Sequence, residues 1–598
     1  MAYTDNFPQR PVFMADFANG GRIDPRMTFT RASTANVWDG SKHLSSENLI
    51  ANSEALTGTG YIAVNVTPTT GQADPTGGTN AVQFEQDSGQ TTSGYVLVEN
   101  QPSSGQFTYS FHAKANGKNW IVIQEVFTDS SLNETWFSIS GAGGAGTTNA
   151  NHTNVTVTKF GDWYRCSWTM TSTRVGYLRI GVADSDGSTT VTDSGGVYLY
   201  GLQRNTGGSL LDYQSTSGQI HREYAPSLVS KSNNIGRFDH TTDGQSVAKG
   251  ILIEGQSTNL VTHSSDFSDA SFGKTRASIS ANTGVGPDGT LTADSLVVDG
   301  TAANNHGVYF TYTTGGATSQ AISVYAKAGS KNVIAIRFSP QNGAFTDGYA
   351  YYDLSSAITG SVSASITATA EDCGNGWVRC TAVTTALTNA VGTVVIYVAA
   401  ENGNVSLDGN NYDYVQLWGC QAEANASHAS SLISTSGGAA TRAAESLSVA
   451  TADIGYTGGP FTIVSETDGG YGWYPQVWTL SDESSNNRVY VFRQNYSASD
   501  STNWYLESRS DGASVVSAFF SSSASAGKLA VSYNTNDVSF CASGGAVTTD
   551  TAASLPSTAS ELQIGSHWNS TDHLNGHIKR IALYGEALSD ANLVSLTS

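Results

Sequence analysis

The sequence predicts an all-β protein of three antiparallel β-sandwich domains with a short N-terminal extension. The chain has 598 residues, more than one hydrophobic core normally serves, so several domains are expected. Charged residues make up only 13% and 63 residues are glycine, a composition that disfavours long helices. Short runs of Val, Ile, Tyr and Thr alternate with polar turn residues, which is typical of antiparallel strands. One unit of the sequence also occurs twice.

A hexad marks this duplication, because GDWYRC at Gly161–Cys166 returns as NGWVRC at Asn375–Cys380. Further matches occur in the same order, and their offset only rises, from 211 to 219 residues. These matching pairs are Asn48–Leu56 with Asn259–Phe267, Ala113–Ile123 with Ala326–Ile336, Val197–Gln203 with Val415–Gln421, and STS at Ser215 and at Ser434. The pattern indicates two copies of one domain of about 170 residues, separated by small insertions.

Each matched block alternates apolar and polar residues, so we interpret the duplicated unit as a two-sheet sandwich. We expect the hexad tryptophan to fill the core between the sheets, the arginine to point to the other face, and the cysteine to return inward. A contact with a ligand is the alternative role for the hexad. The residues concerned are Trp163, Arg165 and Cys166 in the first copy, and Trp377, Arg379 and Cys380 in the second.

The repeat divides the chain into five parts. We expect an attachment segment at 1–44, the first sandwich at 45–219, a junction at 220–258, the second sandwich at 259–449, and a third sandwich at 450–598. The first segment contains four arginines in a chain of net charge −21, so we expect it to dock on an acidic particle surface. A disordered tail is the alternative.

The bulk charge and the cysteines exclude several classes of protein. A net charge of −21 disfavours binding to nucleic acid. The chain has five widely spaced cysteines and no CxxC pair, so neither a zinc site nor a disulfide framework is indicated. No apolar run approaches 18 residues and no signal region opens the chain. We therefore expect no membrane insertion, and folding in a reducing cytoplasm.

The last 150 residues or so lie outside the repeat. Lys528–Val547 reads as two strands around a turn at 534–537. Ser589 is placed to cap a short helix whose apolar residues Leu593 and Leu596 would face a sheet.

This region contains few residue patterns typical of catalysis. Glycosidases on sandwich folds need paired carboxylates, and the nearest pair is Glu466 and Asp468, with no third acid following. HLNGH at His573–His577 has two histidines four apart, and with His567 it could hold a metal ion, but its Asn-Gly step indicates a solvated loop. We therefore expect no enzymatic activity.

DSDG at Asp184–Gly187 has two readings. Asp184 and Asp186, with Asp193 as a third carboxylate, are a weak candidate for a calcium site. A plain turn is the alternative, and it is the one the residue types favour. Calcium apart, the sequence indicates no cofactor.

Exposed aromatic rings are what a glycan-binding site needs, together with amides and carboxylates for the sugar hydroxyls. The stretch DGGYGWYPQVW, at Asp468–Trp478, places three aromatic residues among glycines and a proline, which predicts a loop. Trp504 reads instead as a core residue. The candidate glycan-binding residues are Tyr471, Trp473, Tyr474 and Trp568.

Three stretches resemble known families. The repeat, with YAKAG, WVRC and VQLWGCQAE, resembles carbohydrate-binding jelly-roll modules of phage structural proteins. RFDH…GILIEGQSTNL, at 237–260, resembles a junction of bacteriophage tail-fibre and head-fibre proteins, where it commonly follows FTRAST. Here FTRAST stands at Phe29–Thr34, so either the first sandwich is inserted into this element or the element is duplicated. The ending GHIKRIALYGEALSDANLVSL resembles a laminin-G or concanavalin A-like sandwich.

These resemblances imply a non-enzymatic bacteriophage virion protein, made in the host cytoplasm. A tail fibre or adhesin would bind a host-surface glycan, contact other virion proteins and form a homo-oligomer. A head fibre or capsid-decorating protein is the alternative placement. Two other classes are disfavoured. A polysaccharide depolymerase would show paired acids or a β-helix repeat, and a bacterial surface adhesin would show a secretion or anchoring signal, and the sequence indicates none of these.

Overall fold

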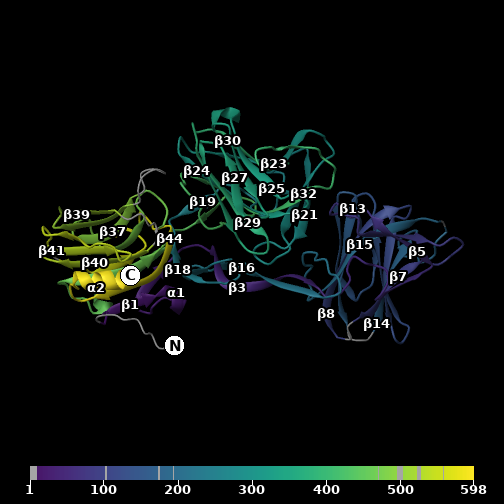
Figure 1. Cartoon of the computed structure of the whole chain (residues 1–598), viewed down its shortest axis with the longest axis horizontal. Coiled ribbons are helices and arrows are strands. Elements are labelled where there is room, and N and C mark those ends of the chain that lie inside the picture. The colour runs from purple at the N-terminus through teal and green to yellow at the C-terminus, as the bar shows by residue number, and fades with distance from the viewer. Residues whose placement is uncertain are drawn as a thin grey trace.

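The computed structural model of the chain describes residues 10–101, 104–172, 176–192, 194–468, 470–494, 503–521, 527–556 and 558–598. Figure 1 shows three β-rich bodies along the long axis, with the first sandwich at one end, the second in the middle and the C-terminal sandwich at the other end. All the paired strands in these ranges are antiparallel except at isolated bridges. The predicted all-β sandwich class is confirmed.

The two repeats have the same strand order in both of their sheets. One sheet of the first sandwich has the order β12 (His152–Phe160), β13 (Trp163–Ser172), β8 (Gly105–Asn116), β15 (Gly196–Thr206), β6 (Ala81–Gln86) and β5 (Val66–Gln72). Its other sheet has the order β11 (Gly144–Thr148), β10 (Leu132–Ser138), β9 (Trp120–Phe127), β14 (Gly176–Ala183), β7 (Tyr95–Gln101) and β4 (Tyr61–Val64).

The second sandwich repeats this arrangement strand for strand. Its first sheet has the order β28 (Ile366–Asp372), β29 (Trp377–Thr385), β24 (Ser319–Ala328), β32 (Tyr414–Ala424), β22 (Ala293–Val298) and β21 (Ala277–Gly284). Its other sheet has the order β27 (Ile358–Val362), β26 (Gly348–Asp353), β25 (Val333–Ser339), β30 (Val391–Val398), β23 (Asn304–Thr313) and β20 (Gly273–Thr275). The short strand β31 (Ser406–Leu407) pairs with β23, and the 3₁₀ turn η1 spans Gln341–Gly343.

The register of the hexad strand is also the same in both copies. Tyr164 lies opposite Ala113 in the first, and Val378 lies opposite Ala326 in the second. Trp163 and Trp377 therefore open equivalent strands, as the sequence matches predicted.

The faces expected for the hexad residues are wrong in one respect. Side chains two residues apart on a strand share a face, so the tryptophan and the arginine of each hexad point the same way. The main core between the sheets takes Tyr164 and Cys166 instead, and in the second copy Val378 and Cys380. The tryptophans lie in separate clusters on the outer face. Trp163 packs with Ala81 and Tyr200, and Trp377 packs with Trp38, Tyr325 and Trp418.

One asparagine locks the ends of each repeat together. The Asn48 amide donates to the carbonyl oxygens of Leu202, at 3.1 Å, and Gln214, at 2.9 Å. The Asn259 amide donates in the same way to Cys420, at 3.1 Å, and Ile433, at 2.8 Å. Both asparagines are buried. The segment that enters each copy is thereby held against the last strand of that copy and the returning segment.

The C-terminal sandwich has two larger sheets. One has the order β17 (Arg237–His240), β18 (Ala248–Ile253), β44 (Gly576–Tyr584), β35 (Phe461–Thr467), β40 (Gly527–Asn534), β41 (Asp537–Ala542) and β42 (Thr548–Asp550), with β1 (Phe13–Asp16) also paired to β44. The other has the order β2 (Met27–Thr30), β34 (Ser446–Ala450), β43 (Glu561–Ile564), β36 (Gln476–Ser481), β37 (Arg488–Gln494), β38 (Asn503–Ser510) and β39 (Ala513–Ser521).

This sandwich is assembled from three separated parts of the chain. Strands β1 and β2 come from the N-terminal region, and β17 and β18 come from the junction between the repeats. Residues 13–30 of the segment expected as a separate extension are therefore built into the C-terminal sandwich, with Phe13 and Phe17 in its core, and its last residues begin β3 (Ala35–Asn48). Residues 1–9 lie outside the described residues. FTRAST and RFDH meet in space, which matches the insertion alternative.

Two long strands lead to the first sandwich and back. They are β3 (Ala35–Asn48) and β16 (His221–Lys231), and together we call them the stalk (Figure 1). Trp38 and Leu228 of the stalk pack on the outer face of the second sandwich, against Trp377 and Trp418. A shorter pair, β19 (Ser257–Asn259) and β33 (Ala440–Arg442), leads in and out of the second sandwich.

Three helical turns complete the C-terminal sandwich, namely α1 (Phe17–Gly20), η2 (Thr451–Ile454) and α2 (Asp590–Thr597). Leu593 and Leu596 of α2 pack on the sheet as predicted, and Ser589 is the N-cap residue, although its side chain makes no capping bond. The predicted pair of strands around residues 534–537 is β40 and β41. All five cysteines are buried and free.

Candidate functional site

A buried ion-pair cluster joins the chain segments that lie before the first sandwich, between the two repeats and after the second sandwich. We call it the hub, and it consists of Arg31, Arg237, Glu254, Arg442 and Glu445. Arg237 contacts Glu254 at 2.7 Å and Glu445 at 2.6 Å, Arg31 contacts Glu445 at 2.7 Å, and Arg442 contacts Glu254 at 3.1 Å. All five side chains are at least 94% buried.

The hub residues come from the motifs that the sequence singled out. Arg31 belongs to FTRAST, Arg237 opens RFDH and Glu254 follows GILI. Burial would raise the pKa of Glu254, but the charges of Arg442 and Arg237 outweigh it and hold that pKa well below its usual range. FTRAST and RFDH…GILI therefore lie where the chain passes from one sandwich to another. The hub holds the second and C-terminal sandwiches beside one groove.

The predicted aromatic loop lies at this boundary, between β35 and β36. Its backbone is held by the turn before β44, because Tyr471 N–H donates to the Leu574 carbonyl at 2.9 Å and the Asn575 amide donates to the Tyr471 carbonyl at 3.1 Å. Gly470 has a φ of 61°, and a Cβ there would lie 2.0 Å from the Leu574 oxygen. Only glycine lets the two loops approach this closely.

The rings of this loop differ in exposure. Trp473 is 63% exposed and Tyr471 is 60% exposed. Tyr471 stacks on His428 of the second sandwich, with ring centres 5.1 Å apart and planes within 18°. Burial lowers the pKa of His428, so its ring is neutral at neutral pH. Tyr474 is half-buried and packs edge-on against Phe492.

Trp473 and Tyr474 line a groove of about 1080 Å³ between the second and C-terminal sandwiches. The second sandwich and its connecting strands contribute one wall, which includes Gln256, Asn425 and His428, and the C-terminal sandwich contributes Asp572 and Asn575. Aromatic rings beside amides and a carboxylate are the groups that hold sugar rings and their hydroxyls. This groove is our candidate functional site.

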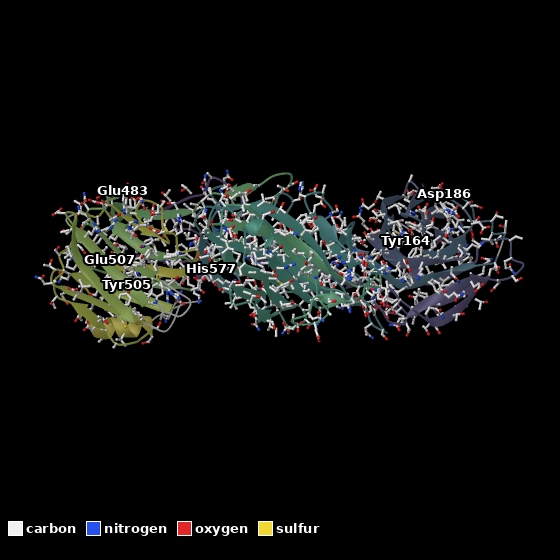
Figure 2. The ribbon with its side chains drawn as sticks, turned by 90° about the horizontal axis from the view of Figure 1, so that it is seen from above. Tyr164, Asp186, Glu483, Tyr505, Glu507 and His577 are labelled. Carbon is white, nitrogen blue, oxygen red and sulfur yellow. The ribbon has the colours of Figure 1, made fainter. Side chains whose placement is uncertain are left out.

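His577 connects Asp468, at the start of the aromatic loop, with Asp239 of β17. Its Nε2 lies 2.7 Å from an Asp239 oxygen, its Nδ1 contacts Asp468, and Asp468 also accepts from the His577 backbone N–H. Burial would lower the pKa of His577, but the hydrogen bonds and charges of Asp239 and Asp468 raise it to about 9. The ring is therefore protonated at neutral pH. Figure 2 shows His577 where the C-terminal sandwich meets the second sandwich.

Trp568, the fourth predicted residue, does not line this groove. It is half-buried next to His567, whose ring lies 5.3 Å from Tyr490. Phe492 and Tyr505 continue the contact, and Figure 2 shows Tyr505 near Glu507. We call this set the aromatic row, and its members are Tyr474, Phe492, Tyr490, Tyr505, His567 and Trp568. It runs across the outer face of the sheet that contains β37.

The middle of the aromatic row was not predicted from the sequence. The signal was present in RVYVFRQ, where Val489 and Val491 alternate with Tyr490 and Phe492, so that both faces of β37 are apolar. Trp504, expected in the core, is 1% exposed.

The acidic and histidine candidates are held apart. Glu466 lies within ion-pair distance of Lys579 and Arg580, while Asp468 is engaged by His577. His573 is buried beside the groove, and burial lowers its pKa. Within the described ranges, no group of three or more potential metal ligands occurs.

The calcium candidates have other partners. Asp184 contacts Lys118 and accepts from the Thr192 backbone at 2.7 Å, while Asp186 accepts from the Thr147 backbone at 2.6 Å. Asp193 lies outside the described residues. The stretch forms a turn, and Figure 2 shows Asp186 at the end of the molecule far from the groove.

No protein-family model and no curated protein matches the chain. Among solved structures, it is similar to the CBM40 module of the Ruminococcus gnavus IT-sialidase, at 13% identity and a TM-score of 0.20, over 25% of this chain and 86% of that one. It is also similar to the CBM22-1–CBM22-2 tandem of Paenibacillus barcinonensis Xyn10C, at 11% identity and a TM-score of 0.20, over 65% and 98%.

The LG1-3 region of the laminin alpha2 chain is a further similar structure, at 9% identity and a TM-score of 0.17, over 84% of this chain and 97% of that one. At such TM-scores the likenesses carry no weight for function, which has to come from the site itself. Among the described helices, none is long and apolar enough to cross a membrane.

Proposed function

We propose that this chain is a non-enzymatic adhesin that binds a surface glycan in the groove between its second and C-terminal sandwiches. Trp473 carries this proposal. Its ring is 63% exposed on a braced loop and lines a groove of about 1080 Å³, so it offers an aromatic face on which a sugar ring can stack. The groove has room for several sugar rings.

The groove favours binding over catalysis. Glu423 lines it, but its oxygens already accept hydrogen bonds from Ser257, Gln421 and Ser430. Asp572 is the other acidic group of the lining. A glycosidase needs a general acid and a second carboxylate poised at the scissile bond. Stacking on one or two rings is weak, so we expect low affinity per site, increased by several copies on one particle.

A place on a phage particle is supported by the junction RFDH…GILIEGQSTNL, which resembles one in bacteriophage tail-fibre and head-fibre proteins. We propose a virion surface protein that contacts other virion proteins and forms a homo-oligomer. A tail fibre that touches the host is our preferred placement, and a head fibre or capsid-decorating protein is the alternative. Electron microscopy of particles with an antibody against this chain distinguishes the two, since label confined to the capsid would contradict the tail placement.

The groove is tested by replacing Trp473 with alanine. We expect this variant to keep the melting temperature of the parent, since exposed loop residues contribute within about 0.5 kcal/mol. Binding to a glycan array or to host cells should be lost. Tyr224→Ala is the matched control, because Tyr224 is 56% exposed on the stalk and away from the groove. A folded Trp473→Ala variant that binds like the parent would refute the groove as the contact.

A further inference from the structure

A second cavity lies between the two repeats, far from the groove. It has a volume of about 240 Å³ and is lined by both sandwiches. The boundary is held by Phe160 and Tyr414, which meet edge-on with ring centres 4.4 Å apart, and by an ion pair of 2.9 Å between Asp212 and Lys327. Asp212 also accepts from the Val285 backbone at 2.6 Å. Figure 1 shows the two sandwiches side by side here, near β13 and β21.

The cavity lies on the outer face of the first repeat, and the equivalent face of the second repeat is covered. Arg165 and Arg379 are equivalent, and each donates from Nη2 to a serine on the neighbouring strand and to a backbone carbonyl of the returning segment. Around Arg379 the outer face is sealed by Trp38 and Leu228 of the stalk, which pack against Trp377. Around Arg165 no such cover lies among the described residues, and the face opens into the cavity.

Arg165 is an unbalanced buried cation. It is only 8% exposed, and its hydrogen bonds to Ser110 and Leu211 both come from Nη2 and go to neutral oxygens. None of the carboxylates in the described part of the chain forms an ion pair with it. Burial lowers the pKa of Arg165 to about 10, and Asp212 offsets only part of that effect. Because Asp212 is already paired with Lys327, an additional anion is what the guanidinium lacks.

The rest of the lining suits a sugar ring. Tyr200 and Tyr213 offer aromatic surface, and their hydroxyls are directed to Glu54, which they contact at 2.8 Å and 3.3 Å. The Tyr414 hydroxyl and the Gln416 amide line the cavity, and neither makes a hydrogen bond to another described residue. These groups are available to hydroxyls of a ligand.

We propose that this cavity binds a single carboxylate-bearing sugar unit, with Arg165 holding the carboxylate and Tyr414 and Gln416 meeting the hydroxyls. The volume is below the about 300–1,000 Å³ of pockets for drug-sized ligands, so it takes one ring and not a chain. Lys327 and Asp212 neutralise each other, and therefore the preference for an acidic sugar comes from Arg165. The site is independent of the groove.

The test uses the full chain carrying Trp473→Ala, so that the groove does not contribute, titrated with sodium glucuronate and with N-acetylneuraminate, and with glucose as the neutral control, in ligand-observed NMR at constant ionic strength. We expect saturable binding of at least one acidic sugar and none of glucose. Arg165→Gln should weaken this binding by about 10- to 100-fold, the effect of losing a charge-assisted hydrogen bond. Arg379→Gln, the matched control in the second repeat, should leave it unchanged.

Should Arg165→Gln fail to fold, the double variant Tyr414→Phe and Gln416→Ala provides the second test. Both changes remove polar atoms that hold no other described residue, so the melting temperature should be kept while acidic-sugar binding falls. The proposal is overturned if neither acidic sugar binds saturably, if glucose binds equally well, or if folded Arg165 and Tyr414/Gln416 variants bind like the parent.

Discussion

Glu445 forms ion pairs with Arg31 and Arg237, and all three side chains are fully buried. Glu445→Gln removes the negative charge and leaves both guanidinium groups short of a partner. We expect a loss of about 3–5 kcal/mol in the free energy of unfolding, because the remaining charges stay buried. Denaturant titration followed by tryptophan fluorescence measures it.

The control for this change is Asp347→Asn, which breaks the half-exposed ion pair with Arg337. Its loss should be below about 1 kcal/mol, since exposed pairs contribute little. Equal effects of Glu445→Gln and Asp347→Asn would show that the hub is not a stabilising element.

His577 gives the protein a predicted pH dependence. Its pKa is about 9 in the folded chain against 6.5 in the unfolded chain, so folding favours the protonated ring. The contribution is complete below pH 6.5 and is lost as the pH rises to about 9, and the shift corresponds to about 3 kcal/mol. Melting temperatures across this window should fall for the parent and stay flatter for His577→Gln.

Half-exposed His221 on the stalk serves as the control residue for that experiment. His221→Gln should retain the full decline of the parent. A His577→Gln variant with the same pH profile as the parent would exclude the charged clamp between Asp239 and Asp468.

At the scale of elements, the paired asparagines allow a comparison within one molecule. Asn48→Ala and Asn259→Ala each leave two backbone carbonyls of the returning segment without their donor. We expect each change to destabilise its own sandwich by about 1–3 kcal/mol. Hydrogen exchange by mass spectrometry locates the loss, and an effect in only one repeat would contradict the equivalence of the two locks.

The duplicated elements were predictable because the same residues recur at rising offsets. The hexad tryptophans were misplaced by one face, although the parity of Trp163 and Arg165 already puts both on one side of a strand. The groove was not predictable in this way. Its walls come from segments that are hundreds of residues apart, so only the aromatic loop at 471–474 was visible in the sequence.

The pairing of the N-terminal segment with the C-terminal sandwich was not predictable either. Phe13 and Phe17 are core residues of a sandwich whose strands, apart from β1 and β2, begin more than two hundred residues later. A short apolar stretch gives no indication of which distant strand it pairs with, because sheet pairing is decided by tertiary contacts.

The whole molecule is one sandwich that carries two others as insertions. Removing residues 1–30 should unfold or strongly destabilise the C-terminal sandwich, because β1 and β2 belong to its two sheets. Replacing residues 49–220 by an Asn-Gly turn should leave that sandwich folded, since Asn48 and His221 are already paired across the stalk.

Calorimetry of both variants separates these outcomes by whether the C-terminal transition persists. If the chain lacking residues 1–30 melts like the parent, the N-terminal strands are dispensable, and an arm that docks on another protein becomes the better description of that segment.

The stalk also determines how the molecule bears load. Both of its strands leave the C-terminal body together and enter the first sandwich together, over a length of about 45 Å for fourteen residues. When the distal sandwich is pulled away, the two strands share the tension side by side, and the ladder between them is neither sheared nor unzipped. Force therefore reaches the body through two covalent chains, which suits a molecule that holds one surface against another under drag.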